Sequence, residues 1–191
     1  MLVKPGQYVL FCVEGGAEHF ILDTLIDRDE LIVPKDHIVR NRTDGGWSIG
    51  RSRSTVNTYL DADYGNQPLL IVRMVDSAKD EYRIPTGYEG RAEVEYLRTQ
   101  PEIEILVIIA EGKYNNYTNN SRKLKPSDYC KIILKKPKVK KREWLEQYWA
   151  TPGLLEDALT EYARLHKFPK HENRGILELI RPNHGNKPAK E

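Results

Sequence analysis

Two acidic residues each follow directly on an apolar run that is typical of a buried strand. Glu14 follows residues 8–13, and Asp76 follows residues 69–75. If these strands are parallel neighbours, their carboxyl ends lie side by side, because neighbouring strands of a sheet are about 5 Å apart. Carboxylates that close repel one another unless a cation lies between them, and oxygen ligands of this kind bind Mg²⁺ or Mn²⁺. We therefore treat Glu14 and Asp76 as candidate catalytic and metal-binding residues, since such a cation could activate water for a phosphodiester reaction.

Three further acids could assist this pair. Asp80 could supply another metal ligand, and Glu18 and Glu104 could support the site. Simpler explanations exist for all five acids. Glu14 and Glu18 could stabilise a helix N-terminus, and Asp76 and Asp80 could be ordinary turn or loop residues. Glu104 lies within an apolar stretch, where an acid needs a partner and a salt bridge would serve.

A basic tract occupies residues 121–142, where Asp128 is the single acid. Such a block suggests an anionic partner, most commonly nucleic acid, although a solvated surface segment would have the same composition. Tyr114 and Tyr117 precede the tract and could stack on bases. The candidate nucleic-acid-binding residues are Lys123, Lys125, Lys131, Lys135, Lys136, Lys138, Lys140 and Lys141.

The order of apolar runs and helical patterns predicts an α/β fold, with a mainly parallel sheet flanked by helices and a helical C-terminal portion. We expect strands at residues 8–13, 30–34, 69–75 and 94–97, and helices from residue 17 onward and at 55–63, 127–135, 141–149 and 153–166. Residues 101–110 fit either class: the proline and acids at their start favour a helix, and the β-branched residues favour a strand. We prefer the helix. The asparagine-rich residues 113–123 predict a surface loop.

Three regions follow from this pattern. Residues 1–122 form the α/β core, residues 123–182 hold the basic segment and the helical portion packed on the core, and residues 183–191 form a disordered tail.

The strand followed by Glu14-Gly-Gly-Ala-Glu18, together with the later strand that ends at Asp76, resembles the Toprim domain. This domain is shared by type IA topoisomerases, bacterial primases, recombination proteins and the nucleases of the OLD and RloB-like families. Glu14 matches the first-strand glutamate, Asp76 matches the acid after the later strand, and Glu104 matches an acid of RloB-like proteins. The resemblance implies a Toprim-like fold and Mg²⁺-dependent cleavage or transfer of phosphodiester bonds in nucleic acid, in defence or nucleic-acid processing. Toprim domains normally carry Asp-x-Asp at the later strand, whereas Ala78 replaces the second Asp here and Asp80 would have to substitute.

The composition favours a cytoplasmic protein. No apolar run approaches the ~20 residues of a membrane span, and the N-terminus lacks a signal-peptide pattern. Cys12 and Cys130 lie far apart in apolar or mixed surroundings, and we interpret both as reduced core thiols.

Two functional hypotheses remain open from the sequence. The first is a metal-dependent nuclease acting on nucleic acid. The second is a non-catalytic Toprim-like module that binds nucleic acid or a protein partner, or forms a homo-oligomer, and the missing second Asp favours it. Trp144, Tyr148 and Trp149 could then form an interface anchor, although core packing is the commoner role of such residues. The absence of a Gly-rich dinucleotide motif disfavours a nucleotide-binding enzyme.

Overall fold

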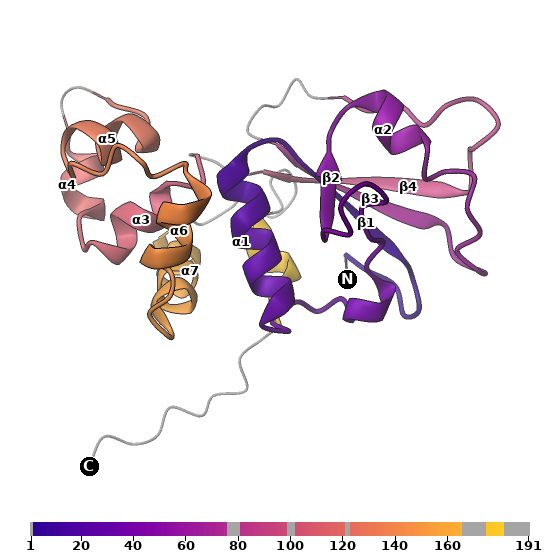
Figure 1. The fold of residues 1–191 in the computed structure, drawn as a ribbon, viewed down its shortest axis with the longest axis horizontal. Coiled ribbons are helices and arrows are strands. Elements are labelled where there is room, and N and C mark those ends of the chain that lie inside the picture. The colour runs from indigo at the N-terminus through magenta and orange to yellow at the C-terminus, as the bar shows by residue number, and fades with distance from the viewer. Residues whose placement is uncertain (1, 76–80, 99–101, 121–122, 166–174, 182–191) are drawn as a thin grey trace, which may run out of the picture.

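The computed structural model describes residues 2–75, 81–98, 102–120, 123–165 and 175–181. Within these residues, four parallel strands form one sheet in the order β2-β1-β3-β4 (Figure 1). The strands are β1 (Val9–Val13), β2 (Ser48–Gly50), β3 (Leu69–Val75) and β4 (Ala92–Arg98). The predicted α/β class with a parallel sheet is confirmed.

Both faces of the sheet are covered, which explains why its central strands are apolar at every position. Every residue of β1 and β3 is buried. Val9 and Phe11 of β1 belong to one core cluster, whereas Leu10 and Cys12 belong to a second cluster on the opposite face. The alternation follows from the two-residue period of a strand.

One helix lies on each face of the sheet. α1 (Gly16–Asp27) contributes its apolar residues to the first core cluster, and α2 (Arg53–Asn57) contributes Val56 to the second. Ser52 caps α2, because its hydroxyl accepts a hydrogen bond from the Thr55 amide at 3.2 Å. The helix predicted at residues 55–63 is therefore present but shorter, and it begins earlier.

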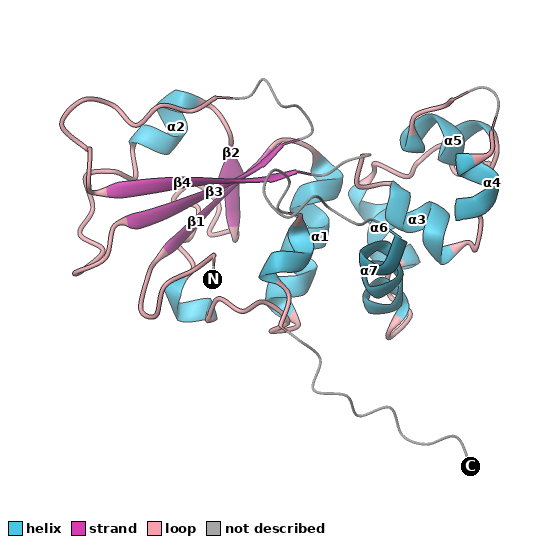
Figure 2. Ribbon diagram, turned by 180° about the vertical axis from the view of Figure 1, so that it is seen from behind, coloured by secondary structure: helices cyan, strands magenta, loops and turns pink. Residues whose placement is uncertain are grey.

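The helical portion of the chain packs against α1 on the side away from the sheet (Figures 1 and 2). It comprises α3 (Ile105–Ala110), α4 (Tyr114–Thr118), α5 (Pro126–Ile132), α6 (Arg142–Tyr148) and α7 (Leu154–Leu165). α3 is buried from Ile105 to Ile109 and contacts α4, α5 and α7, while α6 contacts α1. The preferred helix at residues 101–110 is thus confirmed for α3, and the predicted boundary after residue 122 falls inside this group of helices.

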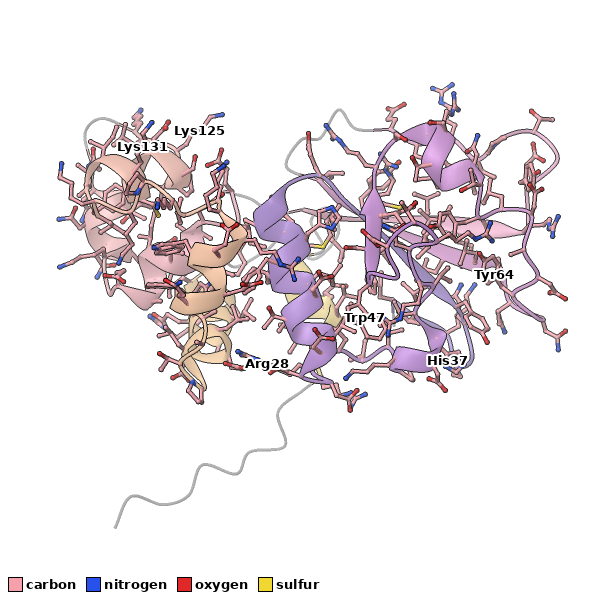
Figure 3. The ribbon with its side chains drawn as sticks, viewed as in Figure 1. Arg28, His37, Trp47, Tyr64, Lys125 and Lys131 are labelled. Atoms are coloured by element: carbon pink, nitrogen blue, oxygen red, sulfur yellow. The ribbon has the colours of Figure 1, made fainter. Side chains whose placement is uncertain are left out.

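Arg28 fastens the end of α1 to the helical portion. Its guanidinium forms an ion pair with Glu156 in the first turn of α7, and Nη2 donates a hydrogen bond to the Trp149 carbonyl at 3.0 Å. Figure 3 shows Arg28 between these elements. Trp149 is 1% exposed, so it serves the core and is not an interface anchor.

Two local predictions are wrong. Residues 30–34 form no strand: Leu31 makes only an isolated bridge to Ile180, and a 3-10 helix (η1, Lys35–His37) follows. Residues 114–118 form α4 where a loop was predicted.

A second 3-10 helix (η2, Ile176–Leu179) lies near the end of the described chain. Among the helices of the described residues, none has the length and apolar character needed to cross a membrane.

Candidate functional site

The sheet reverses its winding direction between β1 and β3. From β1 the chain runs through α1 to β2 on one side, and then through α2 on the opposite face to β3 on the other side. In open α/β sheets, a reversal of this kind opens a crevice at the carboxyl ends of the two strands, and ligands bind there. The predicted adjacency of the strands before Glu14 and Asp76 is present, because β1 and β3 are parallel neighbours.

Glu14 lies at this carboxyl edge of β1 and β3, and we use the word crevice for this edge. Cys12 is in register with Arg73, so the continued register places Glu14 level with Val75, the last residue of β3. The Glu14 side chain is 41% exposed and therefore open to solvent and to a ligand. Asp76 and Asp80, predicted as its partners, lie outside the described residues.

The observed partner of Glu14 is Arg51, which follows the last residue of β2. Arg51 Nη2 and Glu14 Oε1 form an ion pair across the ends of two neighbouring strands. The Arg51 side chain is 35% exposed. A carboxylate and a guanidinium thus occupy the crevice together, and both are accessible to a ligand.

Arg73 supports Arg51 from inside the sheet. This residue of β3 is 3% exposed, and its Nη1 donates a hydrogen bond to the Arg51 carbonyl at 3.1 Å. Its guanidinium also lies over the Tyr82 ring, 5.3 Å from the centroid. A buried charge is costly unless it is paired and hydrogen-bonded, so a cation inside an apolar strand is a signal of a specific role. Sequence reasoning applied this signal to Glu104 but missed it at Arg73.

Glu18 is turned back on the start of its own helix. A Cβ atom placed on Gly15 would come within 2.2 Å of Glu18 Oε2, so the glycine leaves room for the carboxylate. Gly15 is the N-cap of α1 and Glu18 lies in the first turn, where the helix dipole favours an acid. The geometry therefore favours the helix-stabilising explanation for Glu18.

Glu104 has the salt bridge that its burial requires. It is 4% exposed, and Oε1 lies 3.4 Å from Lys140 Nζ. Burial raises the pKa of Glu104, and Lys140 opposes that shift. Burial also lowers the pKa of Lys140, but Glu104, Glu102 and Glu18 outweigh it and raise that pKa.

The basic tract is divided between engaged and exposed lysines. Lys136 lies 3.2 Å from Glu111 Oε1 and 5.2 Å from the centre of the Tyr148 ring, and Lys140 pairs with Glu104. Figure 3 shows Lys125 and Lys131 on the helical portion at the end far from the sheet. The exposed lysines among the candidates, apart from Lys140, are Lys123, Lys125, Lys131, Lys135, Lys138 and Lys141.

The described residues do not by themselves make a metal site. No group of three or more His, Cys, Asp or Glu side chains that could hold an ion occurs among them. At the crevice they supply one carboxylate, that of Glu14, and its observed partner is a cation. A metal ion there would need ligands beyond the part of the chain that the structure describes.

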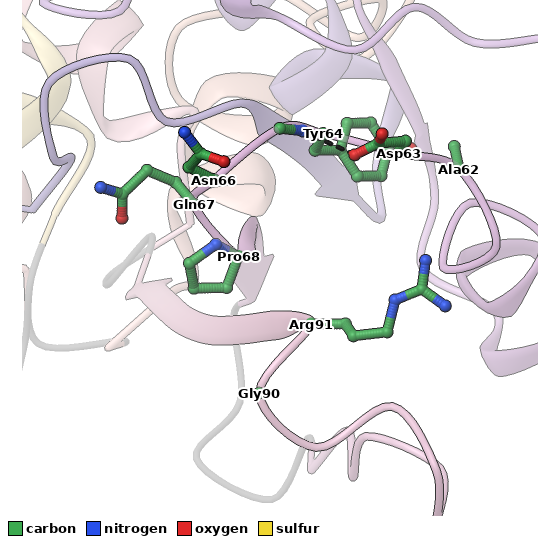
Figure 4. A pocket seen from close by; sticks show the side chains of 9 residues that line it. Ala62, Asp63, Tyr64, Asn66, Gln67, Pro68, Gly90 and Arg91 are labelled. Atoms are coloured by element: carbon green, nitrogen blue, oxygen red, sulfur yellow. Dashed lines mark hydrogen bonds between the residues drawn. The ribbon is translucent and has the colours of Figure 1, made fainter.

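A small hollow lies at the other end of the sheet. Its volume is about 160 Å³, and its lining includes Tyr64, Pro68 and Arg91 (Figure 4). Pro68 immediately precedes β3, and Arg91 immediately precedes β4. The hollow therefore lies at the amino ends of the strands, away from Glu14.

Comparisons with protein-family models, with curated proteins and with solved structures found no match to this chain.

Proposed function

We propose that this chain is a Toprim-like, nuclease-like hydrolase that acts on phosphodiester bonds of nucleic acid with the help of Mg²⁺ or Mn²⁺. The observation that carries the proposal is the parallel adjacency of β1 and β3, which brings Glu14 to the carboxyl-end crevice at the reversal of the sheet. The residue that follows β3 is Asp76. Adjacent strand ends are the arrangement that two acids need to share a cation.

Glu14 and Asp76 are the proposed catalytic and metal-binding residues, with Asp80 as a further ligand. Glu14 is accessible and lies at the strand end, as a ligand must. A bound divalent cation would supply charge neutralisation at the phosphate and a more acidic water molecule. Glu104 and Glu18 contribute by holding Lys140 and the start of α1 in place.

A cleavage assay tests this function. Single- and double-stranded DNA and RNA are incubated with wild-type protein and Mg²⁺ or Mn²⁺, beside Glu14→Gln and Asp76→Asn. We expect cleavage by the wild type that both substitutions reduce at least a hundredfold, as loss of a group acting in the transition state does. Equal inertness of all three proteins on every substrate would contradict the nuclease proposal.

A non-catalytic nucleic-acid- or protein-binding module is the second candidate, and one observation favours it. Two of the candidate acids that the structure describes already have cationic partners, Arg51 for Glu14 and Lys140 for Glu104. Thermal unfolding with and without Mg²⁺ or Mn²⁺ separates the two candidates. A cation at a hundred times its Kd stabilises the folded state by about 2.7 kcal/mol, whereas a module without a metal site shows no shift.

We also propose a cytoplasmic location. Cys12 and Cys130 are both buried, and no disulfide joins them. Buried thiols of this kind suit a reducing compartment.

A further inference from the structure

Arginine and hydroxyl side chains gather where β2 ends, beside Glu14. The segment runs Arg51-Ser52-Arg53-Ser54-Thr55. Ser52 Oγ lies 2.6 Å from Thr55 Oγ1 and 3.2 Å from Ser54 Oγ. Arg53 Nη2 donates a hydrogen bond to the Arg83 carbonyl at 3.1 Å. These contacts fix the course of the segment along the crevice.

The buried Arg73 side chain holds the main chain of Arg51 in place through a hydrogen bond. Arg73 reaches the Arg51 carbonyl from the neighbourhood of the strand ends, and Arg73 itself is almost wholly buried. These contacts bring together the guanidinium groups of Arg51 and Arg73 and the carboxylate of Glu14. An accessible guanidinium such as that of Arg51 is a group that binds phosphate.

The Arg51–Glu14 ion pair can exchange partners at little cost. Both side chains are more than a third exposed. Exposed ion pairs of this kind change a folding or binding equilibrium constant by only about two- to fivefold. A phosphodiester offers the guanidinium two oxygens in the planar geometry that arginine matches best. A phosphate can therefore replace Glu14 as the partner of Arg51.

We propose that Arg51 is the residue of this site that binds a backbone phosphate of nucleic acid, and that the phosphate takes the place of the Glu14 carboxylate as the partner of the Arg51 guanidinium. The inference rests on the proposed function and names the group by which that substrate is anchored. It differs from the sequence-based expectation, which placed phosphate binding in the lysine tract. Lys136 and Lys140 of that tract are engaged with Glu111 and Glu104.

Binding without metal tests the inference apart from catalysis. Fluorescence anisotropy of a labelled single-stranded oligonucleotide is measured in EDTA at several salt concentrations. We expect Arg51→Gln to weaken binding about tenfold, as loss of a charge-assisted contact does, and to lower the salt slope by about 0.7, the value for one phosphate. Arg51→Lys keeps the charge but not the planar fork, so its affinity is expected to lie between the two.

Glu14→Gln supplies a readout that a merely structural role of Arg51 would not produce. Removing the competing carboxylate should strengthen binding in EDTA by about two- to fivefold. Arg164→Gln is the matched control, because Arg164 is an exposed arginine on α7 that pairs with Glu161 at 2.6 Å. It should leave affinity and salt slope unchanged.

Two outcomes would overturn the inference. One is wild-type affinity and salt slope in Arg51→Gln, with loss of binding confined to a Lys125→Gln/Lys131→Gln/Lys135→Gln variant. The other is absence of binding by the wild type in EDTA. Neither outcome decides the proposed function, which fails separately if the cleavage assay with Mg²⁺ or Mn²⁺ shows no activity.

Discussion

Glu14 and Arg51 end two neighbouring parallel strands and form an ion pair across the carboxyl edge of the sheet. The pair places an acid that could bind a cation beside a guanidinium that could bind a phosphate. A divalent cation and a phosphate are the two charged components of a metal-dependent phosphodiester reaction. We expect the cation and the phosphate to bind cooperatively. A phosphate on Arg51 frees the Glu14 carboxylate for the cation, and a cation on Glu14 frees the Arg51 guanidinium for the phosphate.

The Gly15–Glu18 contact predicts different effects at two adjacent glycines. Gly15→Ala would displace the Glu18 carboxylate, and we expect it to lower the free energy of unfolding by about 0.5–1 kcal/mol, the scale of a helix-start interaction. Gly16→Ala is the control: its Cβ atom would lie 3.7 Å from the Lys140 carbonyl, an ordinary contact. Urea unfolding should show no loss, or a gain, for Gly16→Ala. Equal destabilisation by both changes would contradict the role given to Glu18.

The ion pair with Lys140 stabilises the ionised form of the buried Glu104 side chain. Lys140→Met should lower the free energy of unfolding at pH 7 by about 1–3 kcal/mol, because a buried carboxylate loses its cation. Burial raises the folded-state pKa of Glu104, so its ionisation costs stability as the pH rises through that pKa. The loss should therefore shrink as the pH falls, because a growing share of Glu104 is then protonated in the folded state. A pH-independent loss in urea unfolding would count against this explanation.

The joint between α1 and α7 should weaken as the pH rises. Burial, together with the hydrogen bond and charge of Glu156, raises the pKa of Glu30 to about 7. The unfolded-state pKa is near 4.5, so the stability that protonated Glu30 contributes is complete below pH 4.5 and is lost as the pH rises through 7. After allowance for solvent screening, we expect a change of about 1 kcal/mol.

Glu30→Gln gives the control for this joint, because the amide stays neutral at every pH. Thermal unfolding between pH 5 and 8.5 should show a fall in Tm for the wild type that is absent or reduced in the variant. Parallel curves for the two proteins would exclude Glu30 as the cause.

Both thiols should be unreactive until the protein unfolds. Burial raises the pKa of Cys130 to about 12, and the charge of Glu104 adds to that effect. Cys12 lies on β1 with 0% exposure. We expect a thiol reagent at pH 8 to modify neither cysteine in native protein and both in urea, since the thiolate is the reactive form. Rapid labelling of native protein would show that one of them is accessible.

The long strands could be predicted from the sequence, whereas the short ones could not. β3 occupies the residues expected of it, because a strand buried on both faces must be apolar throughout. β2 has three residues and contains the buried Ser48, so no periodicity marks it. Since β2 was missed, Arg51 could not be recognised as the residue at a strand end beside Glu14.

Helix α4 shows how tertiary contacts override composition. Its residues are largely asparagine and tyrosine, which are poor helix formers. The Tyr117 ring packs edge-on against the Tyr129 ring at 5.2 Å, and the Tyr129 hydroxyl donates a hydrogen bond to Asn116 Oδ1 at 2.6 Å. Both contacts join α4 to Tyr129 of α5. Contacts between separate helices cannot be recognised from the local sequence.

Direct measurement of Mn²⁺ binding tests the central claim, that Glu14 is a ligand of a divalent cation. The electron paramagnetic resonance signal of free Mn²⁺ is followed during titration into wild-type protein and Glu14→Gln, each with and without a single-stranded oligonucleotide. We expect the wild type to remove Mn²⁺ from solution, more tightly with the oligonucleotide, and Glu14→Gln to bind at least tenfold more weakly, as loss of one ligand of a cation site implies. Equal Mn²⁺ binding by the two proteins, or none by either, would contradict the claim.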